Sequence, residues 1–496
     1  MRSEMRFRDN AQVESKASLF CSSRRLAIAE HFRVPHEVVG GPARPGVERL
    51  RTCDGAELLW ASAGDAAGEP PISALVEARG ASIPIFAHVV GDRIAERLLA
   101  ECGGTWSRAV ALTGEDGEHV ASIWRARNGS VFLPFDPDEV CHSYWSERYV
   151  EIAQNRARRQ IRRGTVHGYY RVRGLLPRTT QIWLRRHYSR IQVRTPFPSW
   201  PVETALHDFF DVFTSILGDV GGEPTPRIAA WPHDHAWALV LTHDVEASEG
   251  LAALDPVLDL ERGLGLRSSW NFVPGHYRVD DDRIRDLIAG GFEVGVHGLQ
   301  HDGRDLKSLA HLQERLPAMR EAAERWNAVG FRSPSTQRQW ELMPQLGFDY
   351  DSSYPDTDPF EPQSGGCCTW LPFFNQDMVE LPLTMPQDHT MFVILRHSDE
   401  TMWVRKAEFL RNRGGLALID THPDYLVEDR IMGAYRRLLE QYATDRTAWK
   451  ALPRDVSAWW RRRAASRIER AGTDWTVTGP ATEEARVELV ESTAWR

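Results

Sequence analysis

The chain has 496 residues, of which 42% are hydrophobic and 26% charged, and its 60 Lys and Arg residues against 69 Asp and Glu residues give a formal net charge of -9. This composition is typical of a folded globular protein of roughly two to four domains and excludes a disordered chain. The negative charge also argues against a general nucleic-acid-binding protein.

The first residues lack the apolar core of a signal peptide, and no apolar run approaches the roughly 20 residues of a membrane-spanning helix. We therefore expect a cytoplasmic protein. Residues 1–35 are polar and mixed in charge, and we expect a poorly ordered or peripheral lead there. Residues 36–150 contain short apolar runs between Gly- and Asp-rich turns, which predicts a small mixed α/β module within a separate N-terminal α+β region.

Residues 151–225 are expected to form an Arg-rich helical connector. Between Glu151 and Glu203 the sequence has no acidic residue, while arginines recur from Arg156 to Arg194 among aromatic residues. One interpretation of the segment is a set of helices whose arginines pair with acidic residues elsewhere in the protein. The alternative is a peripheral site for an anionic membrane surface or a lipid-linked sugar, with nucleic acid the least favoured partner.

Strand-like and helical runs alternate over residues 226–450, which predicts a parallel sheet with crossover helices, open or closed into a barrel. The expected strands are 236–242, 268–273, 292–297, 329–332, 379–385, 391–395 and 415–420. The expected helices are near 252–263, 281–290, 305–327, 336–346, 398–413 and 428–443. Residues 451–496 are expected to form a basic helix over Val456–Ala471 and a peripheral acidic tail.

Residues suited to metal binding follow two of these strands. Asp244 and Glu246 end the apolar run that begins at Ala236, and His297 and His301 follow the expected strand 292–297. Functional residues of parallel sheets lie at the carboxyl ends of strands, and two imidazoles with a carboxylate are a common ligand set for a catalytic divalent ion. One carboxylate of the pair would bind the ion and the other would accept a proton from water.

Two further strand ends carry Arg332, which would orient the carboxylate base, and His422, which would protonate a leaving amine. The neighbouring polar residues are interpreted as groups that cap or orient these side chains rather than react, namely His243, Asp302, Asp420 and Asp424.

These motifs together resemble the polysaccharide deacetylase family, also known as the NodB-homology domain or carbohydrate esterase family 4. Thr242–Glu246 resembles its first motif, His297–His301 its histidine pair, Arg332–Pro334 its third motif and Ile419–His422 its last. The four occur in the family's order over roughly 200 residues.

The resemblance implies a distorted (β/α)7-type barrel that hydrolyses the N-acetyl group of an amino sugar or glycan intermediate. It implies a divalent metal, usually zinc, held by Glu246, His297 and His301. It also implies the catalytic residues, which are the base Asp244, its partner Arg332 and the acid His422.

Three positions depart from the family's pattern. Glu246 stands where Asp is usual, and Thr336 stands where a tyrosine usually closes the third motif, so that only its backbone N–H would serve an oxyanion. The family's fourth motif is not clear, and Asp351 occupies roughly its place. Two other functions therefore stay open: a non-catalytic glycan- or glycolipid-binding protein, and a hydrolase of another non-peptide C–N bond, as in a cyclic amide or ureide.

Overall fold

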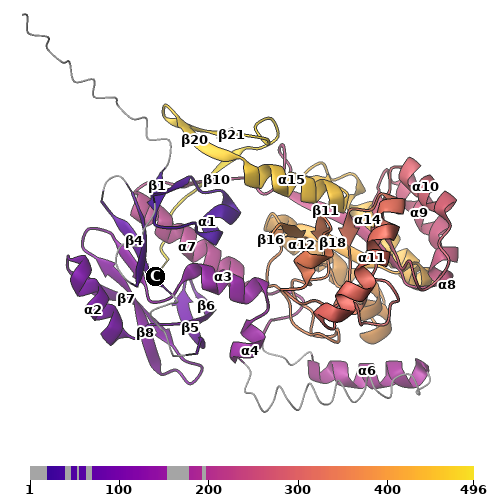
Figure 1. Cartoon of the computed structure of the whole chain (residues 1–496), viewed down its shortest axis with the longest axis horizontal. Helices are drawn as coiled ribbons and strands as arrows, with labels where there is room; N and C mark the ends of the chain where they lie inside the picture. Colours follow the sequence, from indigo (N-terminus) through magenta and orange to yellow (C-terminus); the bar gives the residue numbers. More distant parts are fainter. Residues whose placement is uncertain are drawn as a thin grey trace, which may run out of the picture.

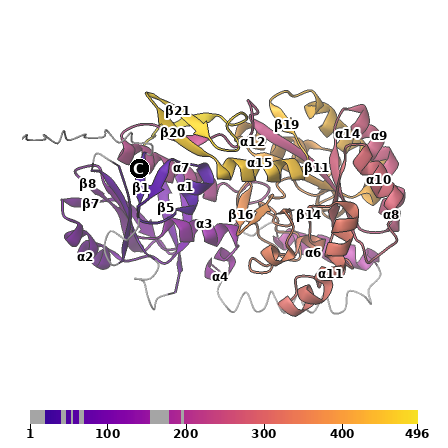
Figure 2. The same cartoon turned by 45° about the horizontal axis from the view of Figure 1, so that its top comes forward.

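The computed structural model of the chain describes residues 19–39, 46–52, 55–62, 70–153, 178–192 and 197–495. Two regions lie side by side in it (Figure 1). A sheet-rich N-terminal region packs against a larger α/β region, and C-terminal elements lie across the junction of the two (Figure 2).

The N-terminal region is built on one mixed sheet of order β2-β1-β3-β4-β9-β8-β7-β5-β6, in which most neighbours are antiparallel. Its strands are β1 (Phe20–Ser22), β2 (His36–Val38), β3 (Val47–Arg51), β4 (Glu57–Ala61), β5 (Ile72–Ala78), β6 (Ala81–Ala87), β7 (Trp106–Thr113), β8 (His119–Ala126) and β9 (Val131–Leu133). Its helices are α1 (Ala27–Phe32), α2 (Asp92–Cys102), α3 (Pro137–Trp145), α4 (Tyr149–Ala153) and α7 (Ala205–Gly221).

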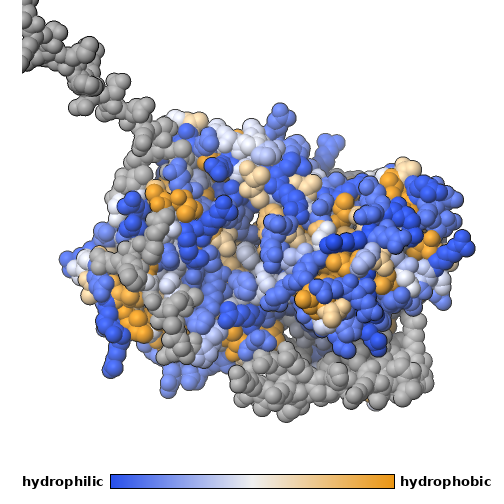
Figure 3. Space-filling model, viewed as in Figure 1, coloured by the Kyte–Doolittle hydropathy of each residue, from blue (hydrophilic) through white to orange (hydrophobic). Residues whose placement is uncertain are grey.

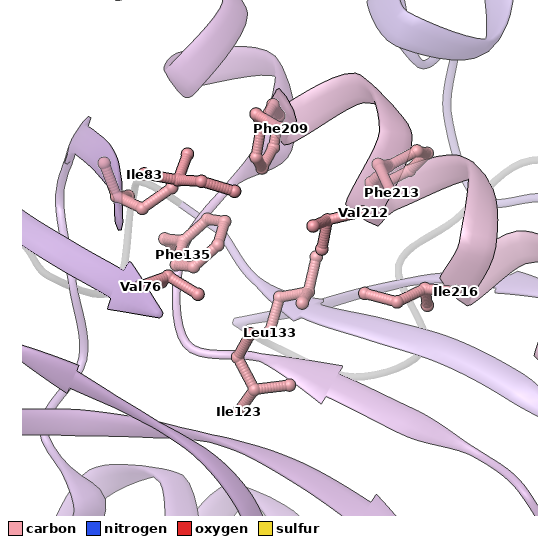
Figure 4. Close-up of a pocket in the computed structure, with 10 residues that line it drawn as sticks. Val76, Ile83, Ile123, Leu133, Phe135, Phe209, Val212, Phe213 and Ile216 are labelled. Carbon is pink, nitrogen blue, oxygen red and sulfur yellow. The ribbon is translucent and has the colours of Figure 1, made fainter. Parts of the chain in front are cut away.

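Helix α7 covers one face of this sheet with apolar side chains. Phe209, Val212, Phe213 and Ile216 point at sheet residues such as Leu133 around a narrow apolar cavity (Figure 4). Helix α2 packs against residues of the other face, where a second small core forms. Successive residues of β4 belong alternately to the main core and to this second core, because the side chains of a strand point to opposite faces with a period of two.

A poorly ordered or peripheral segment was expected over residues 1–35, but the structure differs from this expectation from residue 20 onward. Residues 20–38 form β1, α1 and β2, and the side chains of Phe20, Leu26 and Ile28 are buried in the main core. These apolar residues are too few and too short in span to show a helical or strand period, which is why the sequence did not predict them. Residues 1–18 lie outside the described residues.

Seven parallel strands form the sheet of the second region, in the order β17-β15-β14-β13-β12-β11-β18. They are β11 (Trp237–Val245), β12 (Ser268–Phe272), β13 (Glu293–Val296), β14 (Gly330–Phe331), β15 (Tyr350–Asp351), β17 (Met378–Glu380) and β18 (Leu416–Thr421). The chain beyond β17 returns to β18, where the Met385 N–H donates to Leu418 O at 3.0 Å. The predicted distorted barrel is thereby confirmed.

Two further strands flank this sheet, antiparallel β16 (Phe373–Asn375) on β17 and parallel β19 (Ala448–Lys450) on β11. The helices of the region are α8 (Ser248–Ala252), α9 (Leu254–Gly263), α10 (Asp281–Ala289), α11 (Leu309–Trp326), α12 (Thr401–Asn412), α13 (Pro423–Leu426) and α14 (Asp429–Ala443). Every residue of β11 is buried because helices and loops cover both sides of a parallel sheet.

Two expected elements of this region are wrong. The expected strand 391–395 is part of a π-helical segment, η4 (His389–Ile394), because a short run of buried apolar residues does not distinguish strand from helix. The expected helix 336–346 consists of two 3-10 turns, Pro334–Thr336 and Met343–Leu346, and the backbone of Ser335 and Thr336 is left-handed. Strand β15 was not expected.

The C-terminal residues join the two regions. The basic helix α15 (Pro453–Ala465) ends earlier than expected and is followed by a hairpin of β20 (Arg467–Ala471) and β21 (Asp474–Thr478). The expected peripheral tail instead forms β22 (Val487–Val490), which pairs with β10 (Thr225–Ile228), and Trp495 is buried. A peripheral tail is therefore a wrong expectation for the described residues up to 495.

Aromatic stacking and buried hydrogen bonds hold the two regions against each other. The ring of His207 in α7 stacks on Trp370 with centroids 3.4 Å apart, and the Tyr149 hydroxyl donates to Gly366 O at 2.8 Å. Arg338 is fully buried and pairs with Glu147 at 2.5 Å. One continuous apolar core runs through both regions.

Of the expected Arg-rich connector 151–225, the structure describes residues 151–153, 178–192 and 197–225, and its arginine-rich part forms α6 (Arg178–Gln192), close to the helix expected from Gln181 to Val193. Arg185 lies 3.6 Å from Glu361, and Arg186 donates to Val393 O at 2.9 Å, so two of its arginines bind the barrel region. Residues 154–177 and 193–196, with the arginines that they contain, lie outside the described residues. An anionic partner for this segment stays a prediction.

The face of the molecule in Figure 3 is mainly hydrophilic, and its apolar residues form small separate patches. Among the described residues, no helix has both the length and the apolar character that crossing a bilayer requires.

Candidate active site

The carboxyl ends of the parallel strands bring the sequence-predicted residues together. Strand β11 carries Asp244 and leads into Glu246, β13 leads into His297, β14 into Arg332 and β18 into His422. Because neighbouring strands run in the same direction, these ends lie at one edge of the sheet. The alternation of side chains along β11 places Thr242 and Asp244 on the inner side and His243 on the outer side.

Glu246, His297 and His301 each offer one ligand atom, and these atoms lie within 4.8 Å of one another. Nε2 of His301 is 2.9 Å from Oε1 of Glu246. Two ligands of one zinc ion, each about 2.1 Å from it, are separated by distances of this order. The longer side chain of Glu246 therefore still reaches the two histidines.

His297 is held in a form that suits a metal ion. Nδ1 of His297 donates to Arg332 O at 3.1 Å, which leaves the lone pair of Nε2 free. Burial lowers the pKa of His297 to about 4, so the ring is neutral near pH 7. The Nε2 atoms of both histidines are buried and have no well-aligned hydrogen-bond partner among the described residues, as expected for ligands of an ion.

Asp244 is buried beside this ligand set. It accepts a hydrogen bond from Asn271 Nδ2 at 2.8 Å, and its Oδ2 lies 3.7 Å from Nε2 of His297. Burial raises the pKa of Asp244, but its interactions with His297, which is protonated at low pH, and with Arg332 outweigh burial and hold the pKa below its usual value. The carboxyl group is therefore ionised at neutral pH and can accept a proton.

Arg332 is fully buried and binds several groups at once. Its Nη1 atom lies 2.7 Å from Asp420 and 3.4 Å from Asp244, and it donates to Thr242 Oγ1 at 2.8 Å. Its Nη2 atom donates to Ser352 Oγ at 2.9 Å. Burial and the charge of Asp244 raise the pKa of Asp420. Arg332 thus links Asp244 to the interior of the barrel, with Asp420 as its nearer carboxylate.

His422 also lies beside the ligand set, with its Nε2 3.6 Å from Oε1 of Glu246, and it forms a second close group with Asp244 and Asp420, whose ligand atoms lie within 4.8 Å of one another. Its Nδ1 donates to Asp388 at 2.7 Å, and its backbone N–H donates to the other oxygen of Asp388 at 2.7 Å. Although burial lowers the pKa of His422, the charges of Asp388 and Asp420 raise it well above its usual value. The ring can therefore carry a proton to a leaving group.

Asp388 was not predicted from the sequence. Its position after the expected strand 379–385 was a usable signal, because functional residues follow the ends of parallel strands. The second strand expected at 391–395 made Asp388 look like part of a loop between two strands. Asn271 in β12 was missed for another reason, since a single amide within an apolar strand has no motif of its own.

The structure places four other residues away from the ligand set. His243 lies in a buried network, with Nε2 2.8 Å from Glu261, and Asp302 binds Arg315 at 2.6 Å. Asp351 is fully buried and accepts a hydrogen bond from Ser353 Oγ at 2.6 Å. The backbone N–H of Thr336, expected to be available for an oxyanion, donates to Ser333 O at 3.1 Å.

Comparison with known proteins gives matches of fold alone. No protein-family profile matches the chain, and no curated protein matches its sequence. A candidate polysaccharide deacetylase from Mycobacterium smegmatis is 19% identical over 51% of this chain and 99% of its own, with a TM-score of 0.40. A second from Pseudomonas aeruginosa is 17% identical, with 46% and 92% covered and a TM-score of 0.38.

A solved allantoinase is similar to the same extent, at 15% identity over 47% of this chain and 92% of its own, with a TM-score of 0.38. Two of these three proteins are described by the name of the family that the sequence motifs resemble.

Proposed function

We propose that this protein is a metal-dependent hydrolase that removes the N-acetyl group from an amino sugar or glycan intermediate. The observation that carries the proposal is the placement of a base and an acid beside one ligand set. Asp244 lies 3.7 Å from the ligand His297, and His422 lies 3.6 Å from the ligand Glu246.

The metal would be held by Glu246, His297 and His301, and zinc suits two imidazoles and one carboxylate. When bound, such an ion supplies Lewis acidity toward an amide carbonyl and lowers the pKa of water. The buried Nε2 atoms of the two histidines support this assignment, because without an ion two polar atoms would be left without a well-aligned partner.

Two residues of the chain carry out one proton transfer each. Asp244 accepts a proton from the attacking water, and Asn271 and Arg332 fix the direction of its carboxylate. His422 donates a proton from Nε2 to the departing amine, and Asp388 stabilises the imidazolium through Nδ1.

The two rival functions make different demands on the same residues. A non-catalytic glycan-binding protein needs neither a proton acceptor nor a raised pKa at His422, and the Asp388 contact favours an enzyme over it. A hydrolase of a ureide or cyclic amide would use the same residues, so the substrate alone separates it from a deacetylase.

The test begins with metal content. Elemental analysis of the purified protein and of His301→Ala should give about one zinc per chain in the first and a loss in the second. Acetate release from N-acetylglucosamine oligomers is then measured beside hydrolysis of allantoin and hydantoin. Turnover of the cyclic amides alone would replace the deacetylase by the C–N hydrolase, and metal-free protein without turnover would favour the binding protein.

A further inference from the structure

Two aromatic rings lie next to the proposed acid. The ring of Tyr425 is in edge contact with the imidazole of His422, with centroids 5.4 Å apart and an interplanar angle of 66°. His389 packs nearly parallel to Tyr425, at 5.6 Å and 26°. Both rings are partly exposed, whereas His422 itself is buried.

The positions of both rings are fixed relative to His422. Asp388 accepts hydrogen bonds from the N–H of His389 at 2.6 Å and from the ring and backbone of His422 at 2.7 Å. Tyr425 lies in α13, the helix that begins directly after His422, and its N–H donates to His422 O at 3.0 Å. One carboxylate and one helical turn thus set the acid and the two rings in a single unit.

We propose that Tyr425, supported by His389, is a stacking platform for the pyranose ring that carries the leaving amine. This inference rests on the proposed function. The leaving amine must reach Nε2 of His422, which faces Glu246 while Nδ1 is bound to Asp388. The group attached to that amine is therefore brought beside the Tyr425 ring.

The chemistry of the ring selects the kind of group that binds there. The face of an aromatic ring carries negative potential, and the C–H bonds on one side of a pyranose carry positive partial charge and present an apolar surface. An acyclic amide or a flat ureide offers no such face of C–H bonds. Tyr425 therefore directs the site toward an amino sugar that is recognised through its ring.

The experiment measures binding of an N-acetylglucosamine tetramer to the full-length, zinc-loaded protein by titration calorimetry. We expect Tyr425→Ala to weaken binding by about three- to tenfold, which corresponds to the loss of one aromatic contact. Tyr425→Phe keeps the ring and should bind within about twofold of the wild type. Val427→Ala, at an exposed position two residues further along the chain, is the matched control and should not change binding.

A second variant guards against loss of folding. Tyr425→Leu keeps apolar volume in α13 without an aromatic face and should show the same weakening as Tyr425→Ala, with unchanged circular dichroism and zinc content. Wild-type binding by Tyr425→Ala, or no binding of the tetramer by the wild type, would overturn the platform. Failure of the proposed function is separate, because there the wild type binds the tetramer through Tyr425 but releases no acetate.

Discussion

Asp388 accepts hydrogen bonds from both the ring and the backbone of His422, at 2.7 Å each, so that a single carboxylate fixes the orientation and the charge of the proposed acid. The two residues come from different segments, η4 and the end of β18. Their contact makes the protonation of His422 depend on a residue outside the recognised motifs.

Replacement of Asp388 by Asn should lower kcat by about a hundredfold or more, because general acid catalysis contributes that much and Asn has one acceptor oxygen for three N–H groups. Zinc content should not change, since Asp388 does not belong to the ligand set. Acetate release and elemental analysis check both statements. Asp429→Asn, at an exposed position of α14, is the control, and an unchanged kcat in Asp388→Asn would remove His422 from the acid role.

Replacement of Glu246 by Asp tests whether this chain is built for the longer acid. The shorter side chain would withdraw its oxygen from Nε2 of His301, now 2.9 Å away, and we expect zinc affinity to fall at least about tenfold. Competition with a chromogenic chelator measures this affinity. Glu249→Asp at an exposed position of α8 should bind zinc like the wild type. Tighter binding by Glu246→Asp would mean that Glu246 is a defect rather than a ligand.

The contribution of two buried histidines, His31 and His207, to the stability of the protein should fall as the pH falls below neutrality. Burial lowers the pKa of His31 to about 3 and that of His207 well below its usual value. The unfolded chain binds protons at these histidines near pH 6.5 and the folded protein does not, so the stabilisation is complete above pH 6.5 and is lost below it. Each histidine contributes a slope of roughly 1.4 kcal/mol per pH unit in this range.

Chemical unfolding at pH 7, 6 and 5 measures this slope. In His31→Phe the free energy of unfolding should rise less with pH than in the wild type, because Phe keeps the aromatic contacts of His31 and has no charge to gain. The exposed residue His119 supplies the control His119→Gln, which should keep the wild-type slope. Equal slopes in His31→Phe and the wild type would refute the prediction.

Trp495 should be important for stability although it lies at the end of the sequence. It is buried, and its Nε1 donates to Asp219 of α7 at 3.0 Å. Trp495→Ala should lower the free energy of unfolding by about 3–5 kcal/mol, the usual cost of removing a buried aromatic side chain. Thermal unfolding is compared with that of Trp183→Ala, which removes an exposed tryptophan of α6. Equal thermal unfolding midpoints for the two variants would show that Trp495 does not contribute to the core and would contradict the prediction.

The barrel region could be predicted in large part from the sequence because its strands are short apolar runs that end in polar residues. Asp244, His297, Arg332 and His422 each follow such a run, and parallel strands gather their ends. The distances among them stay beyond sequence reasoning, as Arg332 shows, since it lies closer to Asp420 than to Asp244. Asp388 was missed because the apolar residues after it have no period that separates a helix from a strand.

For the N-terminal region, the sequence predicted a mixed module of strands and helices but not the order of its strands in the sheet. Its sheet brings together strands distant in the sequence, such as β4 and β9, and local apolar patterns do not encode such pairings. The prediction of a peripheral tail for the C-terminal residues was wrong for a similar reason. Charge and an apparent lack of apolar pattern suggested a peripheral tail, whereas β22 is stabilised by its pairing with β10, which the tail's own sequence does not show.

The pairing of β22 with β10 has a consequence for biosynthesis. Strand β10 follows α7 directly, yet its partner and the tryptophan that covers α7 belong to the last part of the sequence. During translation the N-terminal region therefore stays incomplete, with part of α7 uncovered, until residues 487–495 have left the ribosome. We expect nascent chains that stop before β22 to be open to proteases and chaperones at α7, even when the barrel has already formed.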